Sequence, residues 1–111
     1  MNINSTVIAA LTSLSLPVSA NVYEGTADDY ITFNYVDERP ALRADDTDIM
    51  DETTIEIHYF TRGNPQNNKK ALRRLLRVAG FTIISTSEFY ETDTKLTHVI
   101  VEVWIEGEIN D

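Results

Sequence analysis

Two histidines, His58 and His98, are the only imidazoles in this chain of 111 residues and the first candidates for proton chemistry. An imidazole gains or loses its proton near neutral pH, so it can serve as a general acid, a general base or a metal ligand. Each histidine lies in a run of β-branched and aromatic residues that is typical of a strand. The two rings would lie near one another if these strands pair. A histidine in such a strand more often packs than catalyses, so we expect no catalytic residue here.

Other catalytic or cofactor sites lack the residues that they need. The chain has no cysteine, which excludes a thiolate nucleophile, a disulfide framework and a cysteine-based zinc site. Its four glycines form no glycine-rich phosphate-binding loop. The sequence therefore predicts a protein that is not an enzyme and that holds no cofactor and no metal. A metal-dependent enzyme or hydrolase that uses both histidines with nearby carboxylates is the alternative.

An acidic stretch offers oxygen ligands of the kind that Ca²⁺ prefers. It contains Asp45, Asp46 and Asp48, and Asp51 follows. If Asp46 is taken as the first ligand, Met50 occupies a ligand position and no glycine follows, so the pattern departs from an EF-hand. A solvated acidic loop is the first interpretation of this stretch, and weak binding of a divalent cation is the second.

Charge is distributed unevenly along the chain. Five of the nine basic residues lie between Lys69 and Arg77, and seven of the 18 acidic residues lie between Asp37 and Glu52. A cationic helix face is usually the solvated side of an amphipathic helix. It can also bind an anionic partner, and the acidic segment of the same subunit or of a neighbouring copy is the candidate. Contacts between two different patches on neighbouring copies close into a ring or continue as a helix.

The predicted assembly interface consists of these two charged segments. The acidic segment is expected to be a long, mobile loop over residues 37–51, because it contains Pro40, many carboxylates and few apolar residues. In the basic segment, we expect the side chains of Arg73 and Arg77 to be exposed. The interface residues are Asp37, Glu38, Arg39, Arg43, Asp45, Asp46, Asp48, Asp51, Lys69, Lys70, Arg73, Arg74 and Arg77.

Composition limits the class of protein. A formal net charge of −9 argues against general affinity for nucleic acid or anionic membranes, because each neutralised phosphate needs a lysine or an arginine. A hydrophobic content of 42% is ordinary for a folded protein, and 111 residues suffice for one domain, residues 1–111. No apolar run reaches the roughly 18 residues of a membrane span.

The N-terminal segment has two interpretations. The apolar stretch 7–16, followed by Val18-Ser19-Ala20, imitates a secretory signal peptide. However, residues 1–6 carry no lysine or arginine, so we prefer an amphipathic helix that ends before Pro17. The apolar residues that share one face of this helix are Ile3, Val7, Leu11 and Leu14.

The rest of the chain alternates between strand and helix patterns. Residues 31–35 and 55–59 have the period of two that indicates half-buried strands, and residues 81–90 and 96–105 form a predicted hairpin with a turn at 91–95. A helix is expected from Asn64 and Pro65 to Gly80, with Leu72, Leu75, Leu76 and Ala79 on its buried face. This order predicts an α+β fold: an antiparallel sheet, two α-helices packed on one face, and a long acidic loop between the second and third strands.

The order of these elements matches a known family over nearly the whole chain. The match covers the N-terminal helix, the strand 30–35, a long variable loop, the strand 54–61, the helix 69–79 and the final hairpin. The most distinctive segment is residues 90–98, which read Tyr-Glu-Thr-Asp-Thr-Lys-Leu-Thr-His. In these features the chain resembles the tail terminator, or tail-completion, proteins of long-tailed bacteriophages and prophages.

The resemblance implies a structural virion protein. Members of the family look like small α+β domains that form a hexameric ring, end the polymerisation of the tail tube and provide the surface for head-tail joining. By position, residues 37–51 match the family's long flexible loop and the basic helix matches its second helix, and the family has no catalytic residues to carry over.

The partners that the resemblance implies are further copies of the chain, the tail-tube protein and the head connector or completion protein. DNA would pass nearby without specific binding, and no membrane is involved. The implied location is the head-proximal end of the virion tail, and the host cytoplasm during assembly. An acidic DNA-mimic inhibitor of a DNA-binding protein is the alternative, against which the clustered cations of the second helix argue.

Overall fold

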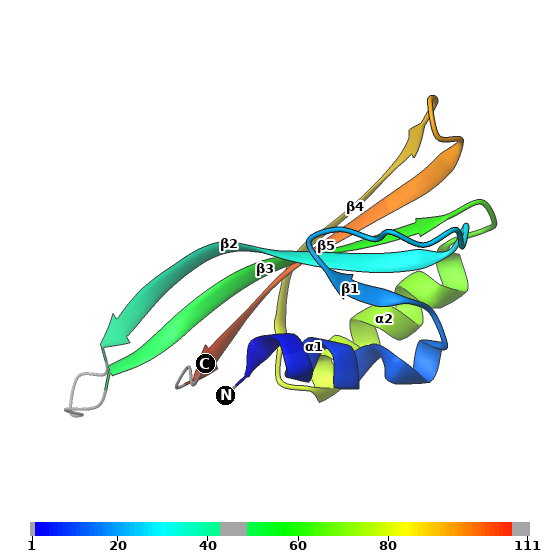
Figure 1. Ribbon diagram of the computed structural model, residues 1–111. Helices are drawn as coiled ribbons and strands as arrows, with labels where there is room; N and C mark the ends of the chain where they lie inside the picture. The colour runs from blue at the N-terminus through cyan, green and yellow to red at the C-terminus, as the bar shows by residue number, and fades with distance from the viewer. Residues whose placement is uncertain (1, 43–48, 108–111) are drawn as a thin grey trace.

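A five-stranded sheet carries both α-helices on one face (Figure 1). The computed structural model describes residues 2–42 and 49–107. Along the chain the elements are α1 (Ile3–Leu11), the 3₁₀ turn η1 (Thr12–Leu14), β1 (Val18–Ala20), β2 (Tyr30–Leu42), β3 (Ile49–Thr61), α2 (Gln66–Val78), β4 (Thr82–Glu91) and β5 (Leu96–Gly107). The strand order is β1-β2-β3-β5-β4. The predicted α+β class is confirmed.

The sheet is mixed rather than purely antiparallel. Strands β2, β3, β5 and β4 are antiparallel neighbours, as predicted, but β1 pairs with β2 in parallel, with Val18 opposite Ile31. The connection over residues 21–29 returns the chain to the end of the sheet where β1 began, which makes the two strands parallel. Three residues are too few to show a periodic pattern, so this strand could not be predicted from periodicity.

The acidic segment contains strand where we predicted a loop. Residues 37–42 of β2 pair with residues 54–49 of β3, from Asp37 opposite Thr54 to Leu42 opposite Ile49. The ladder passes a register shift between Tyr35 and Asp37. The predicted loop over 37–51 is therefore wrong for 37–42 and 49–51, and its remaining residues, 43–48, lie outside the described part of the chain.

Backbone pairing explains why polar residues form these strands. A ladder needs main-chain hydrogen bonds, and polar side chains are tolerated wherever both faces of the strand meet solvent. Pro40 has no N–H to donate, but β1 covers only Ile31–Phe33, so Pro40 lies on an edge where no described strand needs that donor. We call residues 37–42 and 49–52 the arm. Figure 1 shows the arm extending away from the helices, at the opposite end of the sheet from the β4–β5 turn.

The hydrophobic core lies between the sheet and the two helices. Ile3, Val7 and Leu11 of α1 are buried as predicted, and Leu14 packs against the core. In α2, Leu72 and Leu76 are buried and Leu75 and Ala79 are partly buried. The strands contribute Ile31, Phe33, Ile55, Ile57, Tyr59, Val99, Val101, Val103 and Ile105.

The predicted boundaries of α2 are confirmed to within one or two residues, whereas α1 ends at Leu11 and the 3₁₀ turn η1 continues it to Leu14, short of the predicted end before Pro17. The side chain of Asn2 caps α1 by accepting a hydrogen bond from the backbone N–H of Ser5 at 3.1 Å. The Asn64 side chain accepts one from the N–H of Gln66 at 3.0 Å at the start of α2. After α2, Gly80 has φ +102°, a conformation that a side chain disfavours, and this residue turns the chain into β4.

Candidate functional site

The basic residues of α2 divide into two groups. Lys70, Arg74 and Arg77 are exposed, and their spacing of four and three residues places them in one row along the helix, which we call the basic stripe. Lys69 instead faces β4, where its Nζ lies 2.9 Å from Oε1 of Glu88. Arg73 is half-buried, which corrects the expectation that it is exposed.

Side-chain direction explains the position of Arg73. Lys69 and Arg73 are separated by one helical turn on the side of α2 that packs next to β4, so their aliphatic stems cover part of the core. The Nε of Arg73 is buried and has no hydrogen-bond partner among the described residues. Of the five predicted cations, three are therefore exposed and without an ion pair in the described chain, Lys69 is paired with Glu88, and Arg73 is half-buried and without an ion pair there.

The arm carries mainly negative charge. Its described residues include four carboxylates, on Asp37, Glu38, Asp51 and Glu52, against the one guanidinium of Arg39. Arg39 donates hydrogen bonds to Asp37 on the same strand. The predicted interface residues Arg43, Asp45, Asp46 and Asp48 lie outside the described part of the chain.

The arm and the basic stripe do not meet within the described chain. Its ion pairs between acidic and basic side chains are Arg39–Asp37, Arg62–Asp28 and Lys69–Glu88, and none of them joins the arm to α2. In Figure 1 the arm extends past the end of the helical layer rather than over it. The described residues therefore give no support to the interpretation that the two charged segments neutralise each other inside one subunit.

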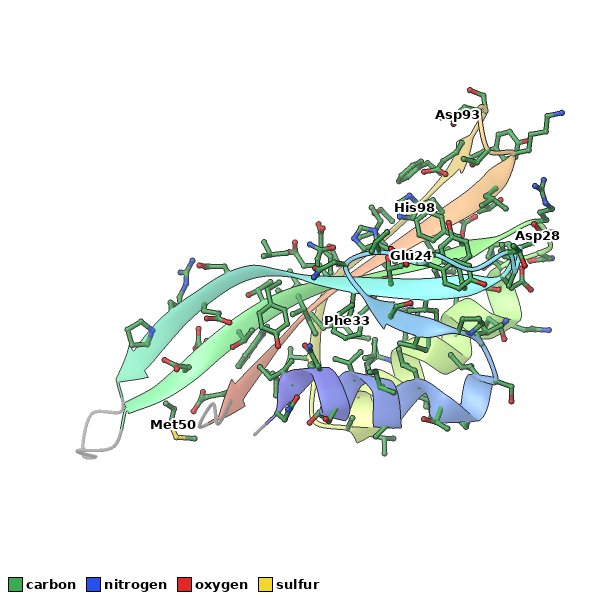
Figure 2. The ribbon with its side chains drawn as sticks, viewed as in Figure 1. Glu24, Asp28, Phe33, Met50, Asp93 and His98 are labelled. Atoms are coloured by element: carbon green, nitrogen blue, oxygen red, sulfur yellow. The ribbon has the colours of Figure 1, made fainter. Side chains whose placement is uncertain are left out.

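The two histidines lie side by side on the face of the sheet opposite the helices. Strand pairing sets His58 of β3 near His98 of β5, and Nδ1 of His58 is 2.7 Å from Nε2 of His98. Figure 2 shows His98 on the far side of the sheet from Phe33, which points toward the helices. The expectation that the rings approach one another if their strands pair is confirmed.

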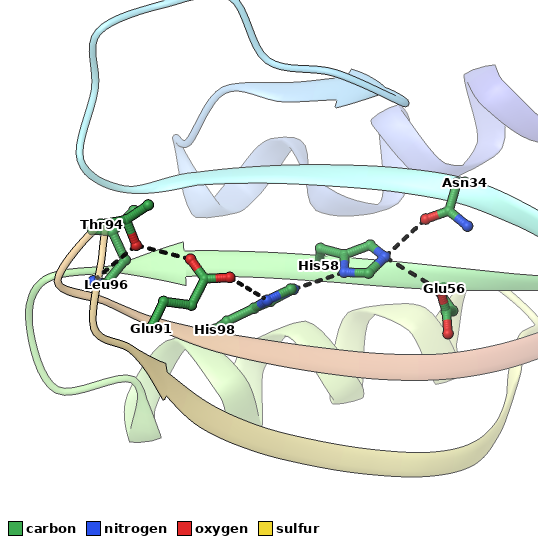
Figure 3. A network of polar contacts seen from close by, with 7 residues as sticks. All are labelled: Asn34, Glu56, His58, Glu91, Thr94, Leu96 and His98. Atoms are coloured by element: carbon green, nitrogen blue, oxygen red, sulfur yellow. Dashed lines mark hydrogen bonds and ion pairs between the residues drawn. The ribbon is translucent and has the colours of Figure 1, made fainter.

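Polar side chains hold both ends of the histidine pair (Figure 3). Nε2 of His58 is 2.8 Å from Oδ1 of Asn34 and 3.4 Å from Oε1 of Glu56. At the other end, Nδ1 of His98 is 3.1 Å from Oε2 of Glu91, whose Oε1 accepts a hydrogen bond from Thr94 at 2.8 Å. The result is one connected network from β2 to the β4–β5 turn.

The histidine pair needs a third hydrogen for its three contacts. Two neutral imidazoles supply two N–H groups, whereas the contacts to Asn34, between the rings and to Glu91 require three. A protonated ring would supply the third, and so would the Asn34 amide rotated by half a turn, so that its Nδ2 donates to His58. Burial lowers the pKa of both imidazoles, and the neighbouring His58 lowers the pKa of His98 further. The neutral pair with a donating Asn34 therefore suits neutral pH.

Aromatic rings close the network from both sides. The ring of His98 stacks on Phe60 with centroids 4.1 Å apart and lies 4.6 Å from the ring of Phe89. The row continues from Phe60 to Tyr30 at 4.7 Å and from Tyr30 to Tyr23 at 4.4 Å. Each histidine nitrogen thus faces a partner inside the network. In the described residues no group of three or more histidines and carboxylates is arranged to hold a metal ion.

The network explains the most distinctive segment of the sequence, residues 90–98. Glu91 accepts from Thr94 and contacts His98, while the hydroxyl of Thr94 accepts from the backbone N–H of Leu96 at 3.3 Å. The backbone N–H of Lys95 donates to the carbonyl of Glu91 at 2.8 Å. These side-chain hydrogen bonds stabilise the β4–β5 turn. Sequence reasoning singled the segment out but missed the roles of Asn34 and Glu91, which depend on strand register.

A shallow hollow of about 400 Å³ lies between α1 and strands β1 and β2. It is lined by Asn4, Ala20, Asn21, Phe33 and Tyr35, and the hydroxyl of Tyr35 donates to Oδ1 of Asn4 at 2.9 Å. None of these lining residues titrates near neutral pH or serves as a common nucleophile. The hollow therefore offers polar contacts but no recognisable reacting group.

Comparison with known proteins shows a similarity in fold. No family model matches the sequence, and no curated protein matches it. Among solved structures, the fold is similar to a chain of a structure described as "Virion of native gene transfer agent (GTA) particle", with a TM-score of 0.65 and 13% sequence identity. The similarity covers 97% of this chain and 96% of that chain. At this identity the similarity shows a shared fold. No helix among the described residues is long and apolar enough to cross a membrane.

Proposed function

We propose that this protein is a structural component of a phage-like virion, and more specifically that it forms a ring that caps the tail tube, ends its polymerisation and joins the tail to the head. The observation that carries the proposal is the similarity in fold, over 97% of this chain, to a chain of a gene transfer agent virion. The whole domain matches a whole virion chain, so the similarity does not rest on a shared supersecondary motif. The resemblance of the element order to tail terminator proteins supplies the specific role.

The charged surfaces suit a ring. The arm and the basic stripe are different patches, and no ion pair joins them within the described part of the subunit. Such patches, when they meet between copies, form head-to-tail contacts that close if the rotation between copies permits. Six copies would match the hexameric ring that the resemblance implies.

The histidine network suits a protein that performs no chemistry. A general base must reach the proton that it removes, directly or through one water molecule. Here the nitrogens of His58 and His98 face each other, Asn34 and Glu91, and rings cover the flanks. The pair thus stabilises the sheet and the β4–β5 turn.

The net charge also suits the proposed position. DNA would pass through the channel of a ring at the head-tail junction. A chain with a formal net charge of −9 gives such a ring a field that repels phosphates, so DNA would slide without being held.

Polymerisation of the tail-tube protein tests this function. The tube protein encoded in the same genome would be assembled with and without this protein, and tube lengths and ends measured by negative-stain electron microscopy. We expect shorter tubes with a ring at one end. The control is an unrelated folded protein of similar size and net charge, which should leave tube length unchanged. Unchanged tube lengths with bare ends, at a molar excess of folded protein, would contradict the proposal.

A further inference from the structure

We propose that the arm of one copy docks on the basic stripe of the next copy, so that Lys70, Arg74 and Arg77 receive carboxylates from the β2–β3 arm of a neighbour. The inference rests on the proposed function, because it names the contact through which copies would join. It goes further by identifying which charged residues are available for that contact and which are already used inside the fold.

Each surface presents charge that the described chain leaves unpaired. Lys70, Arg74 and Arg77 are exposed and have no ion pair among the described residues, whereas Lys69 is paired with Glu88. On the arm, Arg39 is paired with Asp37 and lies opposite Glu52, which leaves Glu38 and Asp51 without an ion pair in the described chain. The unpaired carboxylates and the unpaired cations thus lie on two separate elements.

The formal charges of the two described surfaces are equal and opposite. The basic stripe carries three cations, a formal charge of +3. The described arm carries four carboxylates and one guanidinium, a formal charge of −3. A chain with a net charge of −9 repels its own copies at long range, so a cationic surface facing an acidic arm is the local attraction that can orient two copies.

The arm is built as a rigid extension, which prevents it from bending back to its own α2. Its two strands pair from Asp37 opposite Thr54 to Leu42 opposite Ile49, and β5 pairs with β3 as far as Asp51 opposite Gly107. This ladder continues the sheet into the arm, which curves away at the end opposite the β4–β5 turn and extends past the helices (Figure 1). The long dimension of the subunit is 50 Å, against 24 and 23 Å in the other directions. An elongated subunit with opposite charges on an arm and a helix joins head to tail.

Reciprocal charge reversal tests the contact. One variant reverses the stripe with Lys70→Glu and Arg74→Glu, and a second reverses the arm with Glu38→Lys and Asp51→Lys, which leaves the Arg39–Glu52 pair in place. Mass photometry over a concentration series measures the mass of the assemblies that each variant forms in solution. Negative-stain electron microscopy measures the fraction of tail-tube ends that carry a ring. We expect each variant alone to assemble at least tenfold more weakly than the wild type. An equimolar mixture should recover assembly, because a reversed arm then meets a reversed stripe, and a wild-type arm meets a wild-type stripe.

A matched control separates this contact from net charge. Glu24→Lys with Asp93→Lys makes the same change in net charge as the arm variant, at exposed positions on the β1–β2 connection and the β4–β5 turn. This control should assemble like the wild type. Circular dichroism spectra would confirm that all variants are folded.

The outcomes distinguish the inference from the proposed function. If both reversed variants assemble like the wild type, or if each fails and their mixture also fails, the arm does not dock on the stripe, while a ring on tube ends could still form by other contacts. If the folded wild-type protein neither assembles nor binds tube ends, the proposed function fails as well.

Discussion

The polar network on the outer face of the sheet and the two charged surfaces use similar residues in opposite ways. In the network, His58, His98 and Glu91 face each other or a neighbouring polar group, and aromatic rings cover the flanks. On the arm and the basic stripe, Glu38, Lys70 and Arg74 have no ion pair within the described chain. Polar groups that satisfy each other stabilise one subunit, whereas those left open are available to another molecule. The contacts of the histidines therefore lie within the fold, and our proposal assigns the exposed cations Lys70, Arg74 and Arg77 to assembly.

The largest expected change in the free energy of unfolding distinguishes the buried face of α2 from its exposed face. Leu76 is fully buried on the core-facing side of α2. Leu76→Ala should therefore lower the free energy of unfolding by about 2–5 kcal/mol, because apolar burial is lost and a cavity is left. The neighbouring Arg77→Ala should leave stability nearly unchanged, because its side chain is exposed. Urea denaturation followed by circular dichroism measures both variants. Equal losses of stability would show that the stripe also supports the fold, and would remove the distinction.

Removing one histidine should break the network without affecting assembly. His98→Ala deletes the partner of His58 and of Glu91, which leaves half-buried polar groups unpaired and should cost about 1–3 kcal/mol. The folded variant should still bind tube ends, because the network lies away from the arm and α2. Thr92→Ala, at an exposed position in the same turn, is the control for local disturbance. Loss of assembly by a stably folded His98→Ala variant would place the network at an interface.

Acidification should destabilise the network. Burial lowers the pKa of His58 and His98 below that of an unfolded histidine, although Glu56 and Glu91 oppose this shift. The unfolded chain therefore binds more protons than the folded chain once the pH falls below about 6.5, and the free energy of unfolding should decrease from there toward the lower folded pKa values.

Denaturation at pH 7.5 and pH 5.5 tests this direction. The decrease should be larger for the wild type than for a variant with His58→Gln and His98→Gln, in which neither side chain titrates. A wild-type protein that gains stability on acidification relative to this variant would mean that the folded pair holds a proton more tightly than the unfolded chain.

The smallest expected effect compares two adjacent lysines. Lys69 is paired with Glu88, so Lys69→Ala should lower the free energy of unfolding by about 0.2–1 kcal/mol and leave assembly intact. Lys70 is exposed, so Lys70→Ala should do the reverse, weakening assembly while leaving stability unchanged. Denaturation and mass photometry on the same two samples provide the comparison. If the two variants behave alike, position on the helix does not decide the role of a cation.

The local elements could be predicted from the sequence because each has a local cause. The buried face of α1 follows from the spacing of Ile3, Val7 and Leu11, and the end of α2 follows from Gly80. The strands around Ile57 and Val101 follow from their alternating pattern. These signals depend on a few neighbouring residues, so they need no knowledge of the rest of the fold.

The remaining features depend on contacts between distant segments. The parallel pairing of β1 follows from where the chain returns at Tyr30, and the strands of the arm are held by backbone bonds that polar residues do not reveal. The partners of the histidines depend on the register that sets Phe89 opposite His98, and a shift of one residue would turn every side chain to the other face. For the same reason, the sequence alone could not show that Lys69 pairs with Glu88 while Lys70 is exposed. This difference depends on how α2 packs on β4.

Cryo-electron microscopy of tail tubes capped by this protein tests the central claim most directly, because it shows the copies in contact. We predict a closed ring at one end of each tube, in which the arm of every copy lies against Lys70, Arg74 and Arg77 of the next. Tube ends without a ring, or a ring in which the arm does not contact α2 of a neighbouring copy, would contradict the account.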